Sequence, residues 1–196
     1  HTIYNILQAI CNPGDEVIFA APYWVSYIEM VKLADGIPIT VETTANQNFC
    51  LTANQIAAVV TDKTKAVIIN SPSNPTGTIY TPKALQEIAD LAVDKRFYII
   101  SDEIYESLLY DGHQHCSIAA FNSNIKAITF VVNGVSKAYS MTGWRIGYTA
   151  GPKDAISAMS RIQSHSTSNP TSIAQKAALM AISSSQEAVR KMCVAF

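Results

Sequence analysis

Short apolar runs rich in β-branched residues alternate along this chain with segments of helical periodicity, and this alternation constrains the fold most. The apolar runs cover residues 16–20, 37–41, 66–70, 98–102 and 125–133. Consecutive parallel strands need a long crossover, usually a helix, so the alternation predicts a parallel sheet with helices on its faces. Residues 66–69 and 97–100 are apolar at successive positions, which indicates strands buried on both sides.

Two of the intervening helices carry their own start signals. Thr52 and Gln55 fit a capping box, and Leu51 and Ile56 are spaced to form a hydrophobic staple. Pro82 suits the first position of the next helix, where a missing N–H costs nothing. The apolar positions of that helix recur at helical spacing: Leu85, Ile88, Ala89 and Ala92.

The last third of the chain continues with one strand and then with helices. Residues 144–150 predict a further strand, and after Pro152 the pattern becomes helical, with Ile156 and Met159 on one face. A second helical stretch runs from about Ile173 to the end. The whole pattern predicts an α/β fold built as a doubly wound layer of sheet and helices.

The charge balance argues against several classes of partner. The 196 residues include 14 Lys and Arg against 15 Asp and Glu, for a net charge of −1. DNA, RNA and anionic membranes bind through clustered basic residues, so we expect no nucleic-acid partner. No apolar run approaches the roughly 20 residues that a membrane-spanning helix needs, so we expect no membrane partner.

The four cysteines bear on the surroundings of the chain. The spacing of the four cysteines fits no zinc site and no dense disulfide framework, so we expect buried, reduced thiols and a cytoplasmic location. They are Cys11, Cys50, Cys116 and Cys193.

The start of the chain is a separate observation. Residues 1–5 lack both an initiator Met and a basic signal-peptide region, so we expect a chain that begins within a longer protein.

Polar side chains of unusual variety follow the predicted strands. In open α/β sheets, ligands bind outside the carboxyl ends of the strands, so these residues are the candidates for a site. Each taken singly also fits a structural role, as a cap, a turn, a packing residue or a solvated charge, so the prediction depends on their joint placement. The candidate site residues are Trp24, Asn74, Asp102, Tyr105, Ser136, Lys137 and Arg145.

Pyridoxal phosphate is a ligand whose parts call for this set of groups. A carboxylate such as Asp102 keeps the pyridine nitrogen protonated, which makes the ring a better electron sink. Tyr105 and Asn74 can donate hydrogen bonds to the phenolate oxygen. Lys137 provides an amine that condenses with the aldehyde.

The remaining candidates suit the other parts of the same cofactor. The forked donors of Arg145 and the hydroxyl of Ser136 can hold a phosphate. Trp24 offers a flat surface on which the ring can stack. We therefore predict a pyridoxal-phosphate site, with Lys137 as the catalytic residue.

Four motifs, in order and spacing, resemble the class I/II aminotransferases of the fold-type I pyridoxal-phosphate enzymes. They are Asn-Pro-Thr-Gly at 74–77, Ser-Asp-Glu-Ile-Tyr at 101–105, Ser-Lys-Ala at 136–138 and Thr-Gly-Trp-Arg-Ile-Gly at 142–147. The amino-acid sequences of residues 21–27 and 136–145 look most like those of the bacterial aspartate aminotransferases, in the subgroup whose members sometimes also act on prephenate.

The resemblance implies a three-layer α/β/α large domain with a mostly parallel sheet and one antiparallel strand. It assigns residues 1–196 to an incomplete cofactor-binding domain, without the N-terminal segment and the C-terminal small domain of the family. It further implies a cytoplasmic homodimer that moves an amino group between an amino acid and a 2-keto acid through a Schiff base on Lys137. Aspartate and 2-oxoglutarate are the implied donor and acceptor.

Two alternatives to this function stay open at this point, and a third, a metal site, is disfavoured. The cofactor residues are shared with other fold-type I enzymes, such as carbon–sulfur lyases and aminocyclopropane-carboxylate synthases. The chain could also be a non-catalytic piece that keeps only the scaffold. A metal site at residues 113–116 is disfavoured, because the segment resembles a polar loop and lacks a fourth ligand at a known spacing. We therefore predict no metal.

Overall fold

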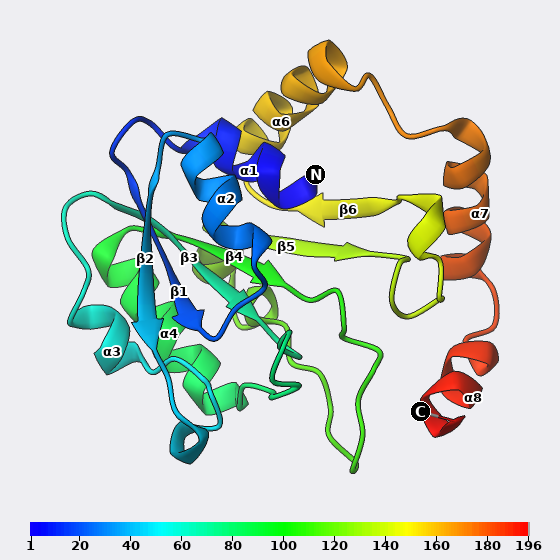
Figure 1. Cartoon of the computed structure of the whole chain (residues 1–196), viewed down its shortest axis with the longest axis horizontal. Helices are drawn as coiled ribbons and strands as arrows, with labels where there is room; N and C mark the ends of the chain where they lie inside the picture. Colours follow the sequence, from blue (N-terminus) through cyan, green and yellow to red (C-terminus); the bar gives the residue numbers. More distant parts are fainter. Residues whose placement is uncertain (196) are drawn as a thin grey trace.

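The computed structural model describes residues 1–195, which form a six-stranded sheet with helices on both faces (Figure 1). The strands are β1 (Glu16–Ala21), β2 (Ile37–Glu42), β3 (Thr64–Asn70), β4 (Tyr98–Asp102), β5 (Thr129–Gly134) and β6 (Gly147–Ala150). They lie in the order β2-β1-β3-β4-β5-β6. The first five are parallel, and β6 pairs antiparallel with β5. The predicted fold class is confirmed.

Helices α1 (Thr2–Ile10), α2 (Ser26–Leu33) and α6 (Lys153–Ser166) cover one face of the sheet. Their core includes Ile6, Leu7, Val31 and Met159, which pack against Phe19 and Phe130 from the strands. In Figure 1, α1 and α2 lie in front of the sheet. This is the face from which α2 delivers a side chain to the candidate site.

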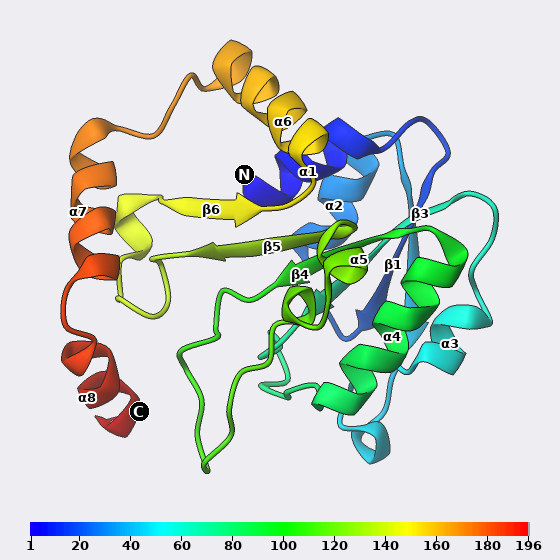
Figure 2. The ribbon, with the colours of Figure 1, turned by 180° about the vertical axis from the view of Figure 1, so that it is seen from behind.

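The opposite face is covered by α3 (Ala53–Ala57), α4 (Pro82–Lys95) and α5 (Ser123–Lys126), as the reverse view in Figure 2 shows. The capping box of Thr52 and Gln55 is present, and Thr81 caps α4 with Pro82 in the first turn. The predicted apolar face of α4 is buried, since Leu85, Ile88, Ala89 and Ala92 all belong to this second core.

The final helices, α7 (Ser172–Ser183) and α8 (Glu187–Ala195), lie past the carboxyl end of β5, where the connection to β6 begins (Figure 1). Short 3-10 turns complete the structure: η1 (Ala45–Gln47), η2 (Ile118–Ala120) and η3 (Thr142–Trp144). The stretch predicted as helical from about Ile173 onward is therefore two helices and not one. The helix is interrupted at Ser184, whose backbone is extended.

Two predicted strands begin later than expected. Residue 125 was expected in β5, but Asn122 caps a short helix there, accepting a hydrogen bond from the backbone of Ile125 at 3.0 Å. The strand starts only at Thr129. Similarly, Trp144 lies in η3 and Arg145 is left-handed with φ 58°, so β6 starts at Gly147. In both cases a local turn outweighs the apolar run.

The cysteines are free, as predicted, but the expectation that they are buried is wrong. Cys11, Cys50, Cys116 and Cys193 are all of intermediate exposure. Cys11, Cys50 and Cys116 pack against the borders of the two core clusters, and Cys193 lies on α8. Among the described residues, no helix is long and apolar enough to cross a membrane.

Candidate active site

A cavity of about 720 Å³ lies at the carboxyl ends of the parallel strands. The strand order reverses direction between β1 and β3, and such a reversal is where open α/β sheets bind ligands. All seven predicted site residues line this cavity: Trp24, Asn74, Asp102, Tyr105, Ser136, Lys137 and Arg145. The structure therefore brings together groups that lie up to 121 positions apart in the sequence.

Asp102 is the buried centre of the site. It ends β4 with 5% of its surface exposed, and its Oδ2 accepts a hydrogen bond of 2.6 Å from the hydroxyl of Tyr27. Its Oδ1 accepts a longer bond of 3.3 Å from the backbone N–H of Ile104. These two donors fix the carboxylate in orientation from α2 and from the turn that follows β4.

Burial and hydrogen bonding act on Asp102 in opposite directions. Burial raises the pKa of Asp102 above its ordinary value, because the charged form loses contact with water. The hydrogen bonds from Tyr27 and Ile104 favour the charged form, and the neighbouring Glu103 disfavours it. Burial and the Asp102 charge raise the pKa of Tyr27, so its phenol stays a donor. A cation in the cavity would stabilise the ionised carboxylate.

Tyr27 is a site residue that the sequence analysis missed. It is only 2% exposed, and it packs edge-on against Trp24 with the ring centroids 5.5 Å apart. Trp24 itself is 39% exposed and lines the cavity. The only sequence clue to Tyr27 is its position one helical turn after Trp24, since the contact with Asp102 spans 75 residues.

Asn70, which was also missed, connects two of the predicted residues. In the parallel register Asn70 lies beside Asp102, and its Nδ2 donates to the Asp102 carbonyl at 2.9 Å. Its Oδ1 accepts from the backbone N–H of Asn74 at 2.7 Å. Asn70 thus fixes the turn of Asn74 against the end of β4. Its place at the end of a predicted strand was the available clue.

Lys137 lies three residues beyond β5 and is partly buried. Its Nζ lies 5.4 Å from the centroid of the Tyr105 ring, within the range of a cation–π contact. Tyr105 follows β4 by three residues, so neighbouring strands supply the amine and the phenol. This arrangement places a nucleophilic amine in the cavity that Asp102 also lines.

Arg145 reaches the site through the antiparallel pairing of the last two strands. Gly134 of β5 lies opposite Gly147 of β6, so the turn with Ser136 and Lys137 and the turn with Arg145 leave the same edge of the sheet. Arg145 Nη1 donates to the Thr142 carbonyl at 2.6 Å, while the residue remains exposed. Its other guanidinium donors are available to an anion.

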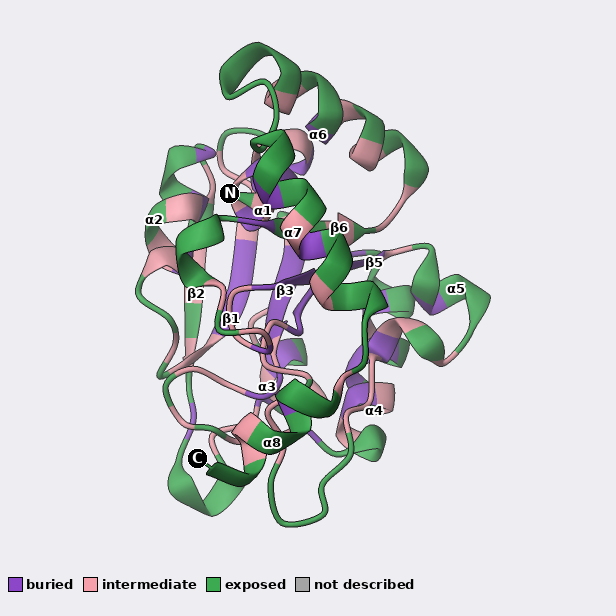
Figure 3. Cartoon of the chain, turned by 90° about the vertical axis from the view of Figure 1, so that its right-hand side faces the viewer, coloured by how far each residue is buried: buried purple, intermediate pink, exposed green. Residues whose placement is uncertain are grey.

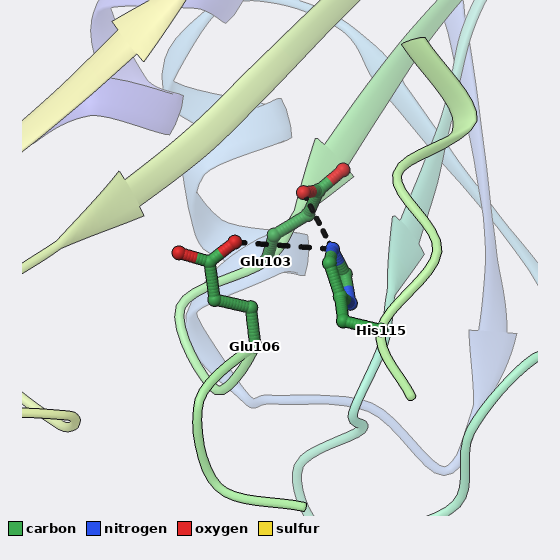
Figure 4. Close-up of side chains that lie close together, drawn as sticks. All are labelled: Glu103, Glu106 and His115. Atoms are coloured by element: carbon green, nitrogen blue, oxygen red, sulfur yellow. Dashed lines mark hydrogen bonds and ion pairs between the residues drawn. The ribbon is translucent and has the colours of Figure 1, made fainter. Parts of the chain in front are cut away.

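Next to the cavity, Glu103 forms a buried network with the loop that follows β4 (Figure 4). Its Oε2 lies 2.7 Å from His115 Nε2, and its Oε1 accepts from the hydroxyls of Ser101 and Ser117. Residues 113–116 form a loop, as predicted, and His115 makes this contact with Glu103 while His113 is exposed. The sequence analysis did not identify Glu103 as part of the site environment.

Comparisons with known proteins agree with this geometry. The sequence model of the family "Aminotransferase class I and II" matches residues 1–194. The chain is 56% identical over 196 residues to the aspartate aminotransferase of Bacillus sp. (strain YM-2), covering 100% of this chain and 50% of that protein. It is 48% identical over 188 residues to the aspartate/prephenate aminotransferase of Thermus thermophilus, covering 96% of this chain and 48% of that protein.

A solved structure gives the same result in three dimensions. The aspartate aminotransferase from Rhizobium meliloti superposes with a TM-score of 0.96 at 38% identity, covering 99% of this chain and 49% of that one. The chain spans about half the length of the curated relatives it matches. On the family match and the shared fold, the chain belongs to the class I and II aminotransferases.

Proposed function

We propose that the protein containing this chain is a pyridoxal-phosphate-dependent transaminase. The observation that carries the proposal is the cavity itself, in which a buried carboxylate, an amine, a phenol, a carboxamide and a guanidinium converge. This donor set matches the chemistry of the cofactor part by part. When bound, pyridoxal phosphate supplies an electron sink that stabilises negative charge at the α-carbon of an amino acid.

Three residues would hold the ring. Asp102 would face the pyridine nitrogen, since its buried carboxylate needs a cation and a protonated ring nitrogen provides one. Asn74 and Tyr105 would donate to the phenolate oxygen from the turns that follow β3 and β4. Trp24 would cover the ring face, and its perpendicular contact with Tyr27 supports it there.

Ser136 and Arg145 would bind the phosphate, because they leave the same edge of the sheet and offer a hydroxyl and forked N–H donors. Lys137 would hold the cofactor covalently through Nζ. Once an incoming amino acid releases that amine, Nζ is the base within the cavity that can take the α-proton and return it. Lys137 is therefore the catalytic residue of the proposal.

For the substrates we propose aspartate as amino donor and 2-oxoglutarate as acceptor. The names of the relatives support this choice, since those compared above are aspartate or aspartate/prephenate aminotransferases. We further propose that residues 1–196 form an incomplete large domain of a longer cytoplasmic protein that acts as a homodimer. Sequence likeness to proteins twice as long supports the domain assignment.

The test uses the longest natural polypeptide that contains this chain. Borohydride reduction with pyridoxal phosphate, followed by peptide mapping, should place the cofactor adduct on Lys137. Lys137→Ala should abolish the adduct and amino transfer, whereas Lys126→Ala, on the exposed end of α5, should change neither. An adduct elsewhere, or none, would contradict the proposal.

A second assay separates amino transfer from the alternatives with the same cofactor. Aspartate and 2-oxoglutarate should yield oxaloacetate and glutamate in equal amounts. Elimination from cysteine conjugates without amino transfer would instead identify a carbon–sulfur lyase. A Lys137 adduct without either activity would identify a scaffold that binds the cofactor and does not turn over.

A further inference from the structure

Two buried carboxylates follow one another at the end of β4. Asp102 is 5% exposed and Glu103 is 2% exposed. Successive side chains of a strand end point to opposite sides, and here Asp102 lines the cavity while Glu103 binds the loop of residues 107–117. Two adjacent ionised carboxylates away from water repel each other, and the Glu103 charge accordingly disfavours the ionised form of Asp102.

Glu103 has three donors, and only one of them can carry a charge. The hydroxyls of Ser101 and Ser117 donate to Oε1 at 2.9 and 2.7 Å. His115 Nε2 lies 2.7 Å from Oε2. Within residues 1–195, His115 is the one basic side chain within ion-pair distance of either Glu103 or Asp102.

The surroundings of His115 favour its cationic form. Besides Glu103, it faces Glu106, whose Oε2 lies 3.9 Å from the same nitrogen (Figure 4). The hydrogen bond that His115 donates to Glu103 is the main cause that raises the pKa of His115, partial burial opposes it, and the charges of both glutamates add to it. The imidazole, with its cationic form favoured, thus lies against the outer side of the Glu103 carboxylate.

Lys137 and Arg145 share the cavity with Asp102, but among the described residues neither lies within ion-pair distance of Asp102 or Glu103. The remaining titratable groups that face Glu103 and Glu106 are a thiol and two phenols, whose neutral forms are favoured. Burial and the Glu103 charge raise the pKa of the Cys116 thiol. Burial and the Glu106 charge raise the pKa of the Tyr139 and Tyr148 phenols, which approach from the β5–β6 side. None of these groups can take the place of the His115 cation.

We propose that His115 is a positioning residue of the cofactor site, which as an imidazolium fixes Glu103 and offsets its charge, so that Asp102 stays ionised toward the pyridine nitrogen. This inference rests on the proposed function for the identity of the ligand. The contact between His115 and Glu103 belongs to the chain without any ligand. The test therefore has one arm that needs no cofactor.

The first arm titrates the His115 imidazole by NMR in the cofactor-free protein, with the full-length polypeptide. We expect His115 to titrate above the ordinary histidine value of about 6.5. Glu103→Gln should shift the His115 midpoint down by about one unit. A His115 midpoint at or below the ordinary histidine value that Glu103→Gln leaves unchanged would overturn the inference.

The second arm measures the pH dependence of the dissociation constant for pyridoxal phosphate. His115→Gln keeps an N–H donor near the Glu103 carboxylate but removes the charge, and His113→Gln is the matched control on the same loop. Removing the positive charge that offsets Glu103 should shift the acidic limb of binding to higher pH by ~0.5–1 unit, because Asp102 then protonates at a higher pH. Coincident profiles for wild type, His115→Gln and His113→Gln would overturn the inference.

The two arms keep this inference distinct from the proposed function. If the wild-type protein binds no pyridoxal phosphate at Lys137, the proposed function fails, and the NMR titration still decides the state of His115. If the cofactor binds and the acidic limb ignores His115→Gln, the proposed function stands and the positioning role of His115 fails. A shifted limb together with a raised His115 midpoint supports both.

Discussion

Two regions of the molecule differ in how far they bury their apolar side chains. One is the sheet with its two helical layers, and the other is the pair of C-terminal helices α7 and α8. In the sheet region, side chains such as Phe19, Phe130 and Leu85 are at most 2% exposed. The helices α7 and α8 expose Ile173, Met180 and Val194 by 76%, 63% and 89%. Figure 3 shows the contrast, with buried colour concentrated in the strands and exposed colour dominating α7 and α8.

A small apolar cluster joins these two regions and supports part of the candidate site. It contains only Val135, Ile146, Ala174 and Ala178 as buried members. Val135 precedes Ser136 and Lys137, and Ile146 follows Arg145, so the turns that carry the proposed phosphate ligands rest on the first half of α7. Asp102 and Asn70 depend instead on the deep core. We therefore expect truncating mutations in the sheet region to lower the free energy of unfolding several-fold more than those in α7 and α8.

Phe130→Ala should have the largest effect. Phe130 is fully buried in β5 and contacts Tyr98, with ring centroids 5.6 Å apart. Truncating such a residue leaves a cavity and typically costs about 3–5 kcal/mol of unfolding free energy. Urea denaturation followed by circular dichroism measures the loss. Ile182→Ala on α7 is the control, and an equal cost for both would break the contrast between the regions.

His115→Ala should lower the free energy of unfolding by removing the contact that holds the loop of residues 107–117 to Glu103. The loop of residues 107–117 lies between the regions, bound to Glu103 on one side and touched by Cys193 of α8 through the Ser107 carbonyl. Losing a hydrogen bond to a charged group costs about 1.5–3 kcal/mol, and the half-buried position favours the lower end.

The pH dependence of this cost has a definite sign. Because the pKa of His115 is raised in the folded state, its charge contributes fully below the unfolded value of about 6.5. The contribution is lost as pH rises through the folded pKa. The difference in unfolding free energy between wild type and His115→Ala should therefore be largest near pH 6 and shrink toward alkaline pH. A difference that grows with pH would contradict the ion pair.

Thr81→Ala and Thr171→Ala form a matched pair of helix caps. The Thr81 hydroxyl accepts from the backbone of Ala84 at 3.2 Å at the start of α4. Thr171 precedes α7 without a side-chain cap hydrogen bond. Thr81→Ala should cost about 1 kcal/mol and Thr171→Ala only a few tenths. Thermal unfolding of both variants checks this, and a reversed order would show that α7 is better anchored than its exposure indicates.

Leu179→Ala on α7 should have the smallest effect. Leu179 is 57% exposed, so truncation removes little buried surface, and surface changes usually stay within about 0.5 kcal/mol. Leu85→Ala on α4, where the side chain is 2% exposed, should cost about 2–5 kcal/mol. A large loss at Leu179, measured on the full-length polypeptide, would show that its apolar surface is covered there.

The sequence predicted the strands best where the apolar run and the turn chemistry agree. Residues 66–70 and 98–102 were predicted as strands and lie in β3 and β4. Only the start of the predicted strand 125–133 is wrong, because the short helix that Asn122 caps extends to Lys126, and β5 begins at Thr129. The break between α7 and α8 was missed for a related reason: no Gly or Pro marks it, and only serines stand there.

The candidate residues were found because each stands at the end of a strand or beside one, where the topology of a parallel sheet makes polar groups meet. Lys137 and Arg145 also belong to motifs of fixed spacing. Tyr27, Asn70 and His115 stayed hidden, because they act through partners 75, 32 and 12 residues away. No periodicity or motif in one sequence encodes such pairs.

The sequence by itself determined the α/β class, the family and the set of groups at the strand ends. These depend on local patterns, since periodicity, caps and short motifs are readable within a few residues. Only the tertiary structure decided that Tyr27 and Glu103 set the environment of Asp102, and that His115 fixes Glu103. Hydrogen bonds and charges act over a few ångströms of space, and only the folded chain brings those residues within that range.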